Sequence, residues 1–334
     1  MSNPMESTPV AEPEHIPAPT GIVVGIDGSE QSNCALKWAA KEALRRKRPL
    51  HLVTAYTVPI FAASGLDGGY ATVDDDVIRA GAESVVREAA ALVADVDLDI
   101  DARVEDGDAA GVLLDLSETA ELLVFGTRGR GGFLGRLLGS VSSALPAHAK
   151  CPTVTVPLCY APKLDGDDPA IVAGEVKEKV ITVGVDGSDQ ARYAVLVAAD
   201  QASRAGLPLR IICAVQPYTG SMAWIPAPVD RDSLFSEIRV QLDAGEAWLR
   251  SYYPDLDIRV DLIEGAPVDV LINASGTSEL LVLGTRGRGG FAGMLLGSTT
   301  EGVRHHAKGP IMVVHDREDP RQETRASFGP MLEA

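Results

Sequence analysis

The sequence lacks the features that mark membrane, secreted or metal-binding proteins. Its 334 residues include four cysteines, which form no C-x-x-C pair and no cluster with histidine at metal-ligand spacing, so no metal site or disulfide framework is indicated. No run approaches the roughly 20 apolar residues that cross a bilayer. Residues 1–18 contain acidic residues and prolines but no basic segment followed by an apolar one, unlike a secretory signal. We therefore expect a cytoplasmic protein with a disordered leader over residues 1–18.

Basic residues are in the minority. The chain has 30 Lys and Arg against 47 Asp and Glu, a formal net charge of −17. Such a charge repels both the nucleic-acid backbone and anionic membrane surfaces. We expect neither nucleic acid nor a membrane as a partner, and no motif identifies a downstream protein partner.

The chain contains an internal duplication. The segment VVGIDGSEQS at residues 23–32 returns as TVGVDGSDQA at residues 182–191. The segment ELLVFGTRGRGGFLGRLLGS at residues 121–140 returns at residues 279–298 with three changes, and KCPTVTV at residue 150 returns as KGPIMVV at residue 308. Because the spacing between the copies is nearly constant, the two halves share one fold.

Each half alternates apolar strand patterns with helical patterns, which is typical of parallel sheets with right-handed crossovers. We predict two tandem doubly wound α/β domains, each a five-stranded parallel sheet of order 3-2-1-4-5 with helices on both faces. The predicted organisation is a leader over 1–18, a first nucleotide-binding domain over 19–158, a linker over 159–178, a second nucleotide-binding domain over 179–315 and a disordered tail over 316–334.

A glycine-rich loop carries the strongest functional signal. Gly126-x2-Gly129-x9-Gly139-Ser140 runs from the end of an apolar strand to the start of a helix, where doubly wound sheets bind ligands. Glycines there permit positive φ angles and a close approach of backbone N–H groups to phosphate. Ser140, at the helix N-terminus, lies where the helix dipole favours an anion. The second half repeats the pattern from Gly284 to Ser298.

Asp27 and Asp186 follow the first strand of each half, next to the switch point of the sheet. A carboxylate at this position can accept hydrogen bonds from a ribose hydroxyl or help to hold Mg²⁺. The other interpretation is an Asx cap at the start of the following helix, with Ser29 as the N-cap.

Motifs of other nucleotide-binding folds are missing. The sequence has no G-x4-G-K-S/T loop of P-loop kinases and ATPases, and the turn after its first strand, GIDGSE, is too short for the pyrophosphate cradle of a dehydrogenase. An adenylating enzyme would carry a Ser-Gly-Gly-rich loop after the first strand and HIGH-like histidine motifs, and this sequence has neither. A flavoprotein domain with bound AMP or FAD remains a minor alternative on sheet topology.

The spacing G-2x-G-9x-G-(S/T) resembles the ATP-binding subgroup of the universal stress protein family, over nearly the whole chain, and the tandem arrangement is similar to the two-domain stress proteins of actinobacteria. The resemblance implies one ATP per domain, with or without Mg²⁺, with Asp27 and Asp186 at the adenosine and the backbone of Ala55 and Ala214 at the adenine edge. The ATP-binding residues implied in the first half are Gly25, Asp27, Ala55, Gly126, Thr127, Arg128, Gly129, Arg130, Gly131, Gly132, Gly139, Ser140 and Val141. Those in the second half are Gly184, Asp186, Ala214, Gly284, Thr285, Arg286, Gly287, Arg288, Gly289, Gly290, Gly297, Ser298 and Thr299.

Two functions remain open at this point. One is a stress-response regulator that is not an enzyme and acts through ATP occupancy. The other is a slow ATPase or autophosphorylating protein with Ser140, Ser298 or Ser142 as the acceptor. We assign no catalytic residue and no metal ligand. The apolar final strands, CPTVTVP and GPIMVVH, are expected to pair as sheet edges, either between the halves or between chains in a homodimer.

Overall fold

The structure is a computed structural model that describes residues 20–58, 60–62, 70–72, 74–129, 139–158, 179–216, 231–287 and 295–324. The predicted leader over 1–18 and the predicted linker over 159–178 lie outside these residues. The elements of the first half are β1 (Ile22–Gly25), α1 (Glu30–Arg46), β2 (Leu50–Tyr56), β3 (Ile60–Ala62), β4 (Tyr70–Thr72), α2 (Asp75–Ala91), β5 (Ile100–Asp106), α3 (Ala109–Leu116), β6 (Leu122–Gly126), α4 (Ser140–His148) and β7 (Thr153–Val156).

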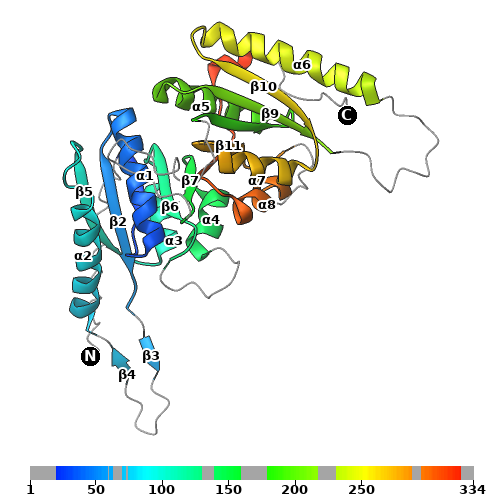
Figure 1. The fold of residues 1–334 in the computed structure, drawn as a ribbon. Coiled ribbons are helices and arrows are strands. Elements are labelled where there is room, and N and C mark those ends of the chain that lie inside the picture. Colours follow the sequence, from blue (N-terminus) through cyan, green and yellow to red (C-terminus); the bar gives the residue numbers. More distant parts are fainter. Residues whose placement is uncertain are drawn as a thin grey trace, which may run out of the picture.

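The second half repeats this order without the β3–β4 hairpin among its described residues (Figure 1). Its elements are β8 (Ile181–Val185), α5 (Asp189–Ala205), β9 (Leu209–Val215), α6 (Arg231–Tyr252), β10 (Ile258–Glu264), α7 (Pro267–Thr277), β11 (Leu280–Gly284), α8 (Ser298–His306), β12 (Ile311–Val314) and the 3₁₀ helix η2 (Pro320–Thr324). None of the helices in the described ranges is long and apolar enough to cross a membrane.

Each half has the predicted strand order 3-2-1-4-5, as β5-β2-β1-β6-β7 and β10-β9-β8-β11-β12. The prediction of two separate five-stranded sheets is incomplete, because β7 and β12 pair and join the halves into one ten-stranded sheet. This pair is antiparallel, with Thr155 opposite Ile311, whereas the other pairs of the large sheet are parallel. Each final strand therefore uses the other as its partner, and the predicted homodimer through these edges is not available in this arrangement.

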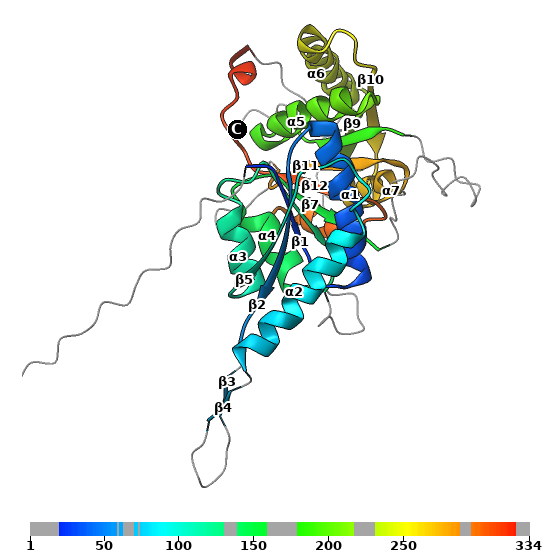
Figure 2. The same cartoon turned by 90° about the vertical axis from the view of Figure 1, so that its left-hand side faces the viewer.

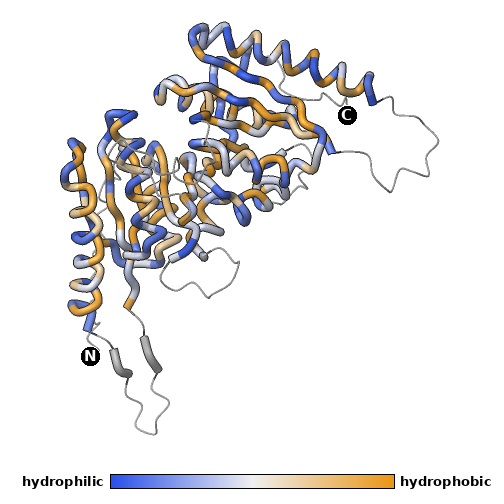
Figure 3. The backbone as a smooth tube through the Cα atoms, in the orientation of Figure 1, coloured by the Kyte–Doolittle hydropathy of each residue, from blue (hydrophilic) through white to orange (hydrophobic). Residues whose placement is uncertain are grey.

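Helices cover both faces of the sheet (Figure 2). On one face a continuous core joins α1 and α2 of the first half to α5 and α6 of the second. On the other face α3 and α4 pack over one half and α7 and α8 over the other. The central strands are mostly hydrophobic, whereas hydrophilic and hydrophobic residues alternate along the outer helices α2 and α6 (Figure 3). Strands buried on both faces explain the near-continuous apolar runs in the sequence.

A buried carboxylate also connects the halves. Glu279, just before β11, accepts hydrogen bonds from Lys41 Nζ at 2.9 Å and from Arg45 Nη2 at 3.2 Å, both on α1. Its side chain is only 10% exposed. Burial alone would raise the pKa of Glu279, but the hydrogen bonds and positive charges of Lys41 and Arg45 outweigh burial and hold the pKa below its ordinary value.

We expect Glu279→Gln to lower the free energy of unfolding at pH 7 by about 1 kcal/mol, because it removes the charge from this bridge. A carboxyl with a depressed folded pKa stabilises the protein above its unfolded pKa of about 4.3, and this contribution is lost as the pH falls through the folded pKa. Urea unfolding at several pH values should show the difference from wild type shrinking in acid. Glu83→Gln removes an exposed intrahelical pair with Arg79 and is the control; equal effects of the two changes would contradict the prediction.

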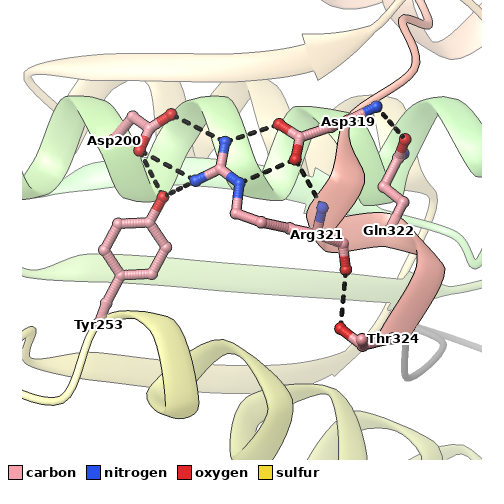
Figure 4. Close-up of polar contacts among 6 residues, drawn as sticks. All are labelled: Asp200, Tyr253, Asp319, Arg321, Gln322 and Thr324. Atoms are coloured by element: carbon pink, nitrogen blue, oxygen red, sulfur yellow. Dashed lines mark hydrogen bonds and ion pairs between the residues drawn. The ribbon is translucent and has the colours of Figure 1, made fainter.

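The C-terminal region folds further than the sequence predicts. Residues 316–324, assigned to a disordered tail, lie against the second domain, and the rest of that tail lies outside the described residues. Arg321 donates to both carboxylate oxygens of Asp200 at 3.2 Å and to Asp319 at 2.7 and 2.9 Å (Figure 4). It also contacts the hydroxyl of Tyr253 at the end of α6. Bidentate pairing of this kind gives the segment a defined position.

Candidate functional site

Each half has a cavity at the carboxyl ends of its first and fourth strands, with a volume of about 370 Å³ in the first half and about 400 Å³ in the second. Residues of the first cavity are Gly25, Ile26, Asp27, Ser32, Val53, Ala55, Ala109, Leu113, Phe125, Gly126, Arg128, Gly129, Gly139, Ser140, Val141 and Ser142. Those of the second are Gly184, Val185, Asp186, Ala191, Ile212, Ala214, Pro267, Leu271, Leu283, Gly284, Arg286, Gly287, Gly297, Ser298, Thr299 and Thr300. Most of the residues predicted from the sequence are therefore brought together, twice, at equivalent places.

Some predicted residues do not line the cavities. Thr127 and Thr285 lie behind the loops, where their carbonyl oxygens accept hydrogen bonds from Gly139 N at 3.3 Å and Gly297 N at 2.8 Å. These bonds hold the start of α4 against the end of β6 and the start of α8 against the end of β11. Arg130, Gly131, Gly132, Arg288, Gly289 and Gly290 lie outside the described residues.

The helices α4 and α8 begin at the cavities without a side-chain cap. Their N-cap residues, Gly139 and Gly297, have extended backbone angles and no side chain to accept from the first turn. By contrast, the side chain of Ser29 caps α1, as the sequence predicts. Uncapped N–H groups at the positive end of a helix form a site for an anion. The structure therefore places a helix start without a side-chain cap at each cavity.

Gly129 and Gly287 allow the aspartates to approach the loop. A Cβ at Gly129 would lie 2.3 Å from Asp27 Oδ2, and one at Gly287 would lie 2.1 Å from Asp186 Oδ2. The described loop glycines do not use the positive φ angles that glycine permits, because none of them has a positive φ. Positive φ occurs instead at Gly28 and Gly187, in the turns that follow the aspartates.

The aspartates form the predicted Asx turns and also line the cavities, whereas their contact with a ribose hydroxyl or Mg²⁺ stays a prediction. Asp27 Oδ1 accepts hydrogen bonds from Ser29 N at 3.0 Å and Ser29 Oγ at 2.6 Å, which is an Asx turn before α1. Asp186 Oδ1 accepts from Ser188 N at 3.0 Å. The other carboxylate oxygen of each aspartate faces the glycine-rich loop. The Asx turn therefore holds each carboxylate at its cavity, so that one side chain forms the turn and also lines the cavity.

The apolar wall of each cavity was not predicted. Val53, Leu113 and Phe125 supply it in the first half, from β2, α3 and β6. Ile212, Leu271 and Leu283 supply it in the second. The strand alternation that places Ala55 at the cavity also places Val53 there, since residues two apart in a strand face the same side. An apolar wall with few polar groups suits a flat aromatic ligand group.

Two hydroxyl groups at the cavities have structural roles. Ser142 Oγ donates to Thr127 O at 2.8 Å and lies 3.0 Å from Gly139 O, and the side chain is buried. In the second half Thr300 Oγ1 donates to Gly284 O at 2.8 Å. Ser140 and Ser298, at the first helical positions, are exposed. Of the serines considered as acceptors, Ser142 is therefore the least accessible.

Comparison with known proteins agrees with this arrangement. The universal stress protein family matches residues 20–157 and 178–315. The universal stress protein Rv2623 of Mycobacterium tuberculosis is 34% identical over 319 residues, which cover 89% of this chain and 96% of that protein. Rv2005c of the same organism is 32% identical over 298 residues, covering 88% and 96%. The crystal structure of a universal stress protein from Archaeoglobus fulgidus has a TM-score of 0.60 at 20% identity, covering 89% and 96%, and shares the fold.

Proposed function

This chain belongs to the universal stress protein family, and on that premise we propose that it is a cytoplasmic stress-response regulator that binds one ATP in each domain and acts through nucleotide occupancy. Among the described residues, Cys151 and Cys213 are buried and form no disulfide, as expected in a reducing compartment. The proposal concerns binding; rapid turnover is not part of it.

The observation that carries the proposal is the uncapped start of α4 and of α8 at a cavity that also holds a fixed carboxylate. In the first half the N–H groups of Ser140 and Val141 would bind the phosphates, with Arg128 adding positive charge. The adenine would lie against the apolar wall. Asp27 would accept a hydrogen bond from a ribose hydroxyl or help to hold Mg²⁺.

The described groups at the two cavities favour slow turnover of ATP. Hydrolysis needs a residue that orients water and charge neutralisation at the γ-phosphate. Among the described residues of the two cavities, the carboxylates are Asp27 and Asp186, and one oxygen of each is already used by the Asx turn. Bound ATP that is not consumed suits a switch whose signal is occupancy.

We expect the double variant Asp27→Ala and Asp186→Ala to bind ATP about tenfold more weakly, or worse, because each site loses a charge-assisted hydrogen bond. Isothermal titration measures this affinity. The control is Asp95→Ala with Asp255→Ala, which removes the same charge from exposed positions.

A single-turnover assay with γ-labelled ATP on desalted wild-type protein separates the regulator from the slow ATPase or autophosphorylating protein. We expect labelled protein and released phosphate to stay near background, well below the turnover of about 1–100 s⁻¹ of dedicated kinases. Normal ATP binding by the double variant, combined with loss of a robust metal-dependent hydrolysis seen in the wild type, would make the aspartates catalytic and the regulator hypothesis wrong.

A further inference from the structure

A buried arginine of the second domain contacts α4, the helix that begins at the first cavity. Arg304 lies on α8, and its side chain is completely buried. Its Nη2 group donates a hydrogen bond to the backbone carbonyl of Ser142, in the first turn of α4. Its Nη1 group donates to Glu301 Oε2 at 2.6 Å, one turn earlier on α8. Arg304 therefore connects the two helices that begin at the two cavities.

The Ser142 carbonyl needs this external donor. In an α-helix the carbonyl of residue 142 accepts from the N–H of residue 146. That residue is Pro146, inside α4, and proline has no N–H. A buried carbonyl without a donor is costly, so the guanidinium of Arg304 replaces the bond that Pro146 removes.

The duplication shows that Arg304, which supplies the donor, and Pro146, which lacks an N–H, occupy equivalent positions in the two halves. Ser140 of α4 corresponds to Ser298 of α8 in the repeated segment, so Pro146 corresponds to Arg304 and Ser143 to Glu301. The first half lacks both members of the Arg304–Glu301 pair, and the second half lacks the proline. The two copies have therefore diverged in a complementary way at their contact.

Ser142 is also part of the first cavity. Its side chain lines that cavity and its hydroxyl donates to Thr127 O, behind the glycine-rich loop. A shift of Ser142 would move the uncapped N–H groups of Ser140 and Val141, two residues and one residue earlier in α4. By holding Ser142, Arg304 therefore helps to fix the positions of the N–H groups of Ser140 and Val141.

We propose that Arg304 is a positioning residue for the first nucleotide site, so that the ATP affinity of the first domain depends on a side chain of the second. The proposal rests on ATP binding as proposed above. It predicts an asymmetry between the sites, because Pro146 offers no such donor to α8.

The test measures each site separately in the full chain, using Gly287→Val to leave the first site and Gly129→Val to leave the second. We expect Arg304→Met to weaken ATP binding at the first site about fivefold or more and to change the second site by less than about twofold. Adding Pro146→Ala should restore the first site to within about twofold of wild type, because the new residue has an N–H for the Ser142 carbonyl. Arg79→Met, at an exposed intrahelical pair, is the control.

Urea unfolding of the wild type, Arg304→Met, the Arg304→Met and Pro146→Ala double variant, and Arg79→Met tests the contact without nucleotide. We expect Arg304→Met to lower the unfolding midpoint and Pro146→Ala to restore part of the loss. If the wild type binds no ATP but the midpoints follow this pattern, the proposed function fails while the contact stands. First-site affinity unchanged in Arg304→Met, or lowered without rescue by Pro146→Ala, overturns the positioning role. If Arg304→Met alone does not fold, the double variant must fold and bind at the first site, and its failure overturns the proposal.

Discussion

Replacing Gly129 with alanine should reduce bound ATP from two molecules per chain to one, and Gly287→Ala should do the same at the other site. The physical reason is steric, because the new Cβ would meet the carboxylate of Asp27 at 2.3 Å or that of Asp186 at 2.1 Å. Such a distance forces the carboxylate or the loop to move, and either movement spoils the cavity. Quantification of nucleotide released from denatured, saturated protein measures the stoichiometry.

A matched control and a second background identify the cause of this loss. Gly81→Ala, in α2, adds a Cβ with no heavy atom within 4 Å and should keep both sites. In the Asp27→Ala background the collision is removed, so Gly129→Ala should cost little further affinity. A large additional loss would mean that the Cβ obstructs the ligand itself. A stoichiometry of one in the wild type that survives Gly287→Ala but not Gly129→Ala would contradict the two-site proposal.

The fold of each half could be predicted from the sequence because the governing signals are local. Alternating apolar strands and amphipathic helices give a doubly wound sheet, and the strand-end position of the glycine-rich loop predicts where the cavity lies. The uncapped helix starts at Gly139 and Gly297 follow from the same pattern, since glycine offers no capping side chain. Because the two halves are copies, each of these predictions holds for the equivalent residues of both halves.

What could not be predicted depends on contacts between distant segments. The apolar final strands predict that an edge will pair, but they do not decide whether the partner is the other half or another chain. The sequence of residues 316–324 has the composition of a tail, and only the juxtaposition with Asp200 and Tyr253 gives Arg321 its partners (Figure 4). Likewise, the hydrogen bond from Arg304 of α8 to α4, next to Pro146, can be recognised only once the two helices are seen in contact.

Thr155→Pro should have the largest effect on stability. Thr155 lies in β7, with Phe125 of β6 opposite on one side and Ile311 of β12 on the other, so its N–H lies in a ladder whichever neighbour it faces. Proline removes that N–H, and its ring does not fit a central strand. We expect the free energy of unfolding to fall by roughly 3 kcal/mol or more, measured by urea unfolding. Thr155→Val keeps the N–H and should lower the free energy of unfolding by less than Thr155→Pro does. Unchanged stability of Thr155→Pro, with loss only of a dimer in light scattering, would mean that β7 pairs between chains rather than with β12 of its own.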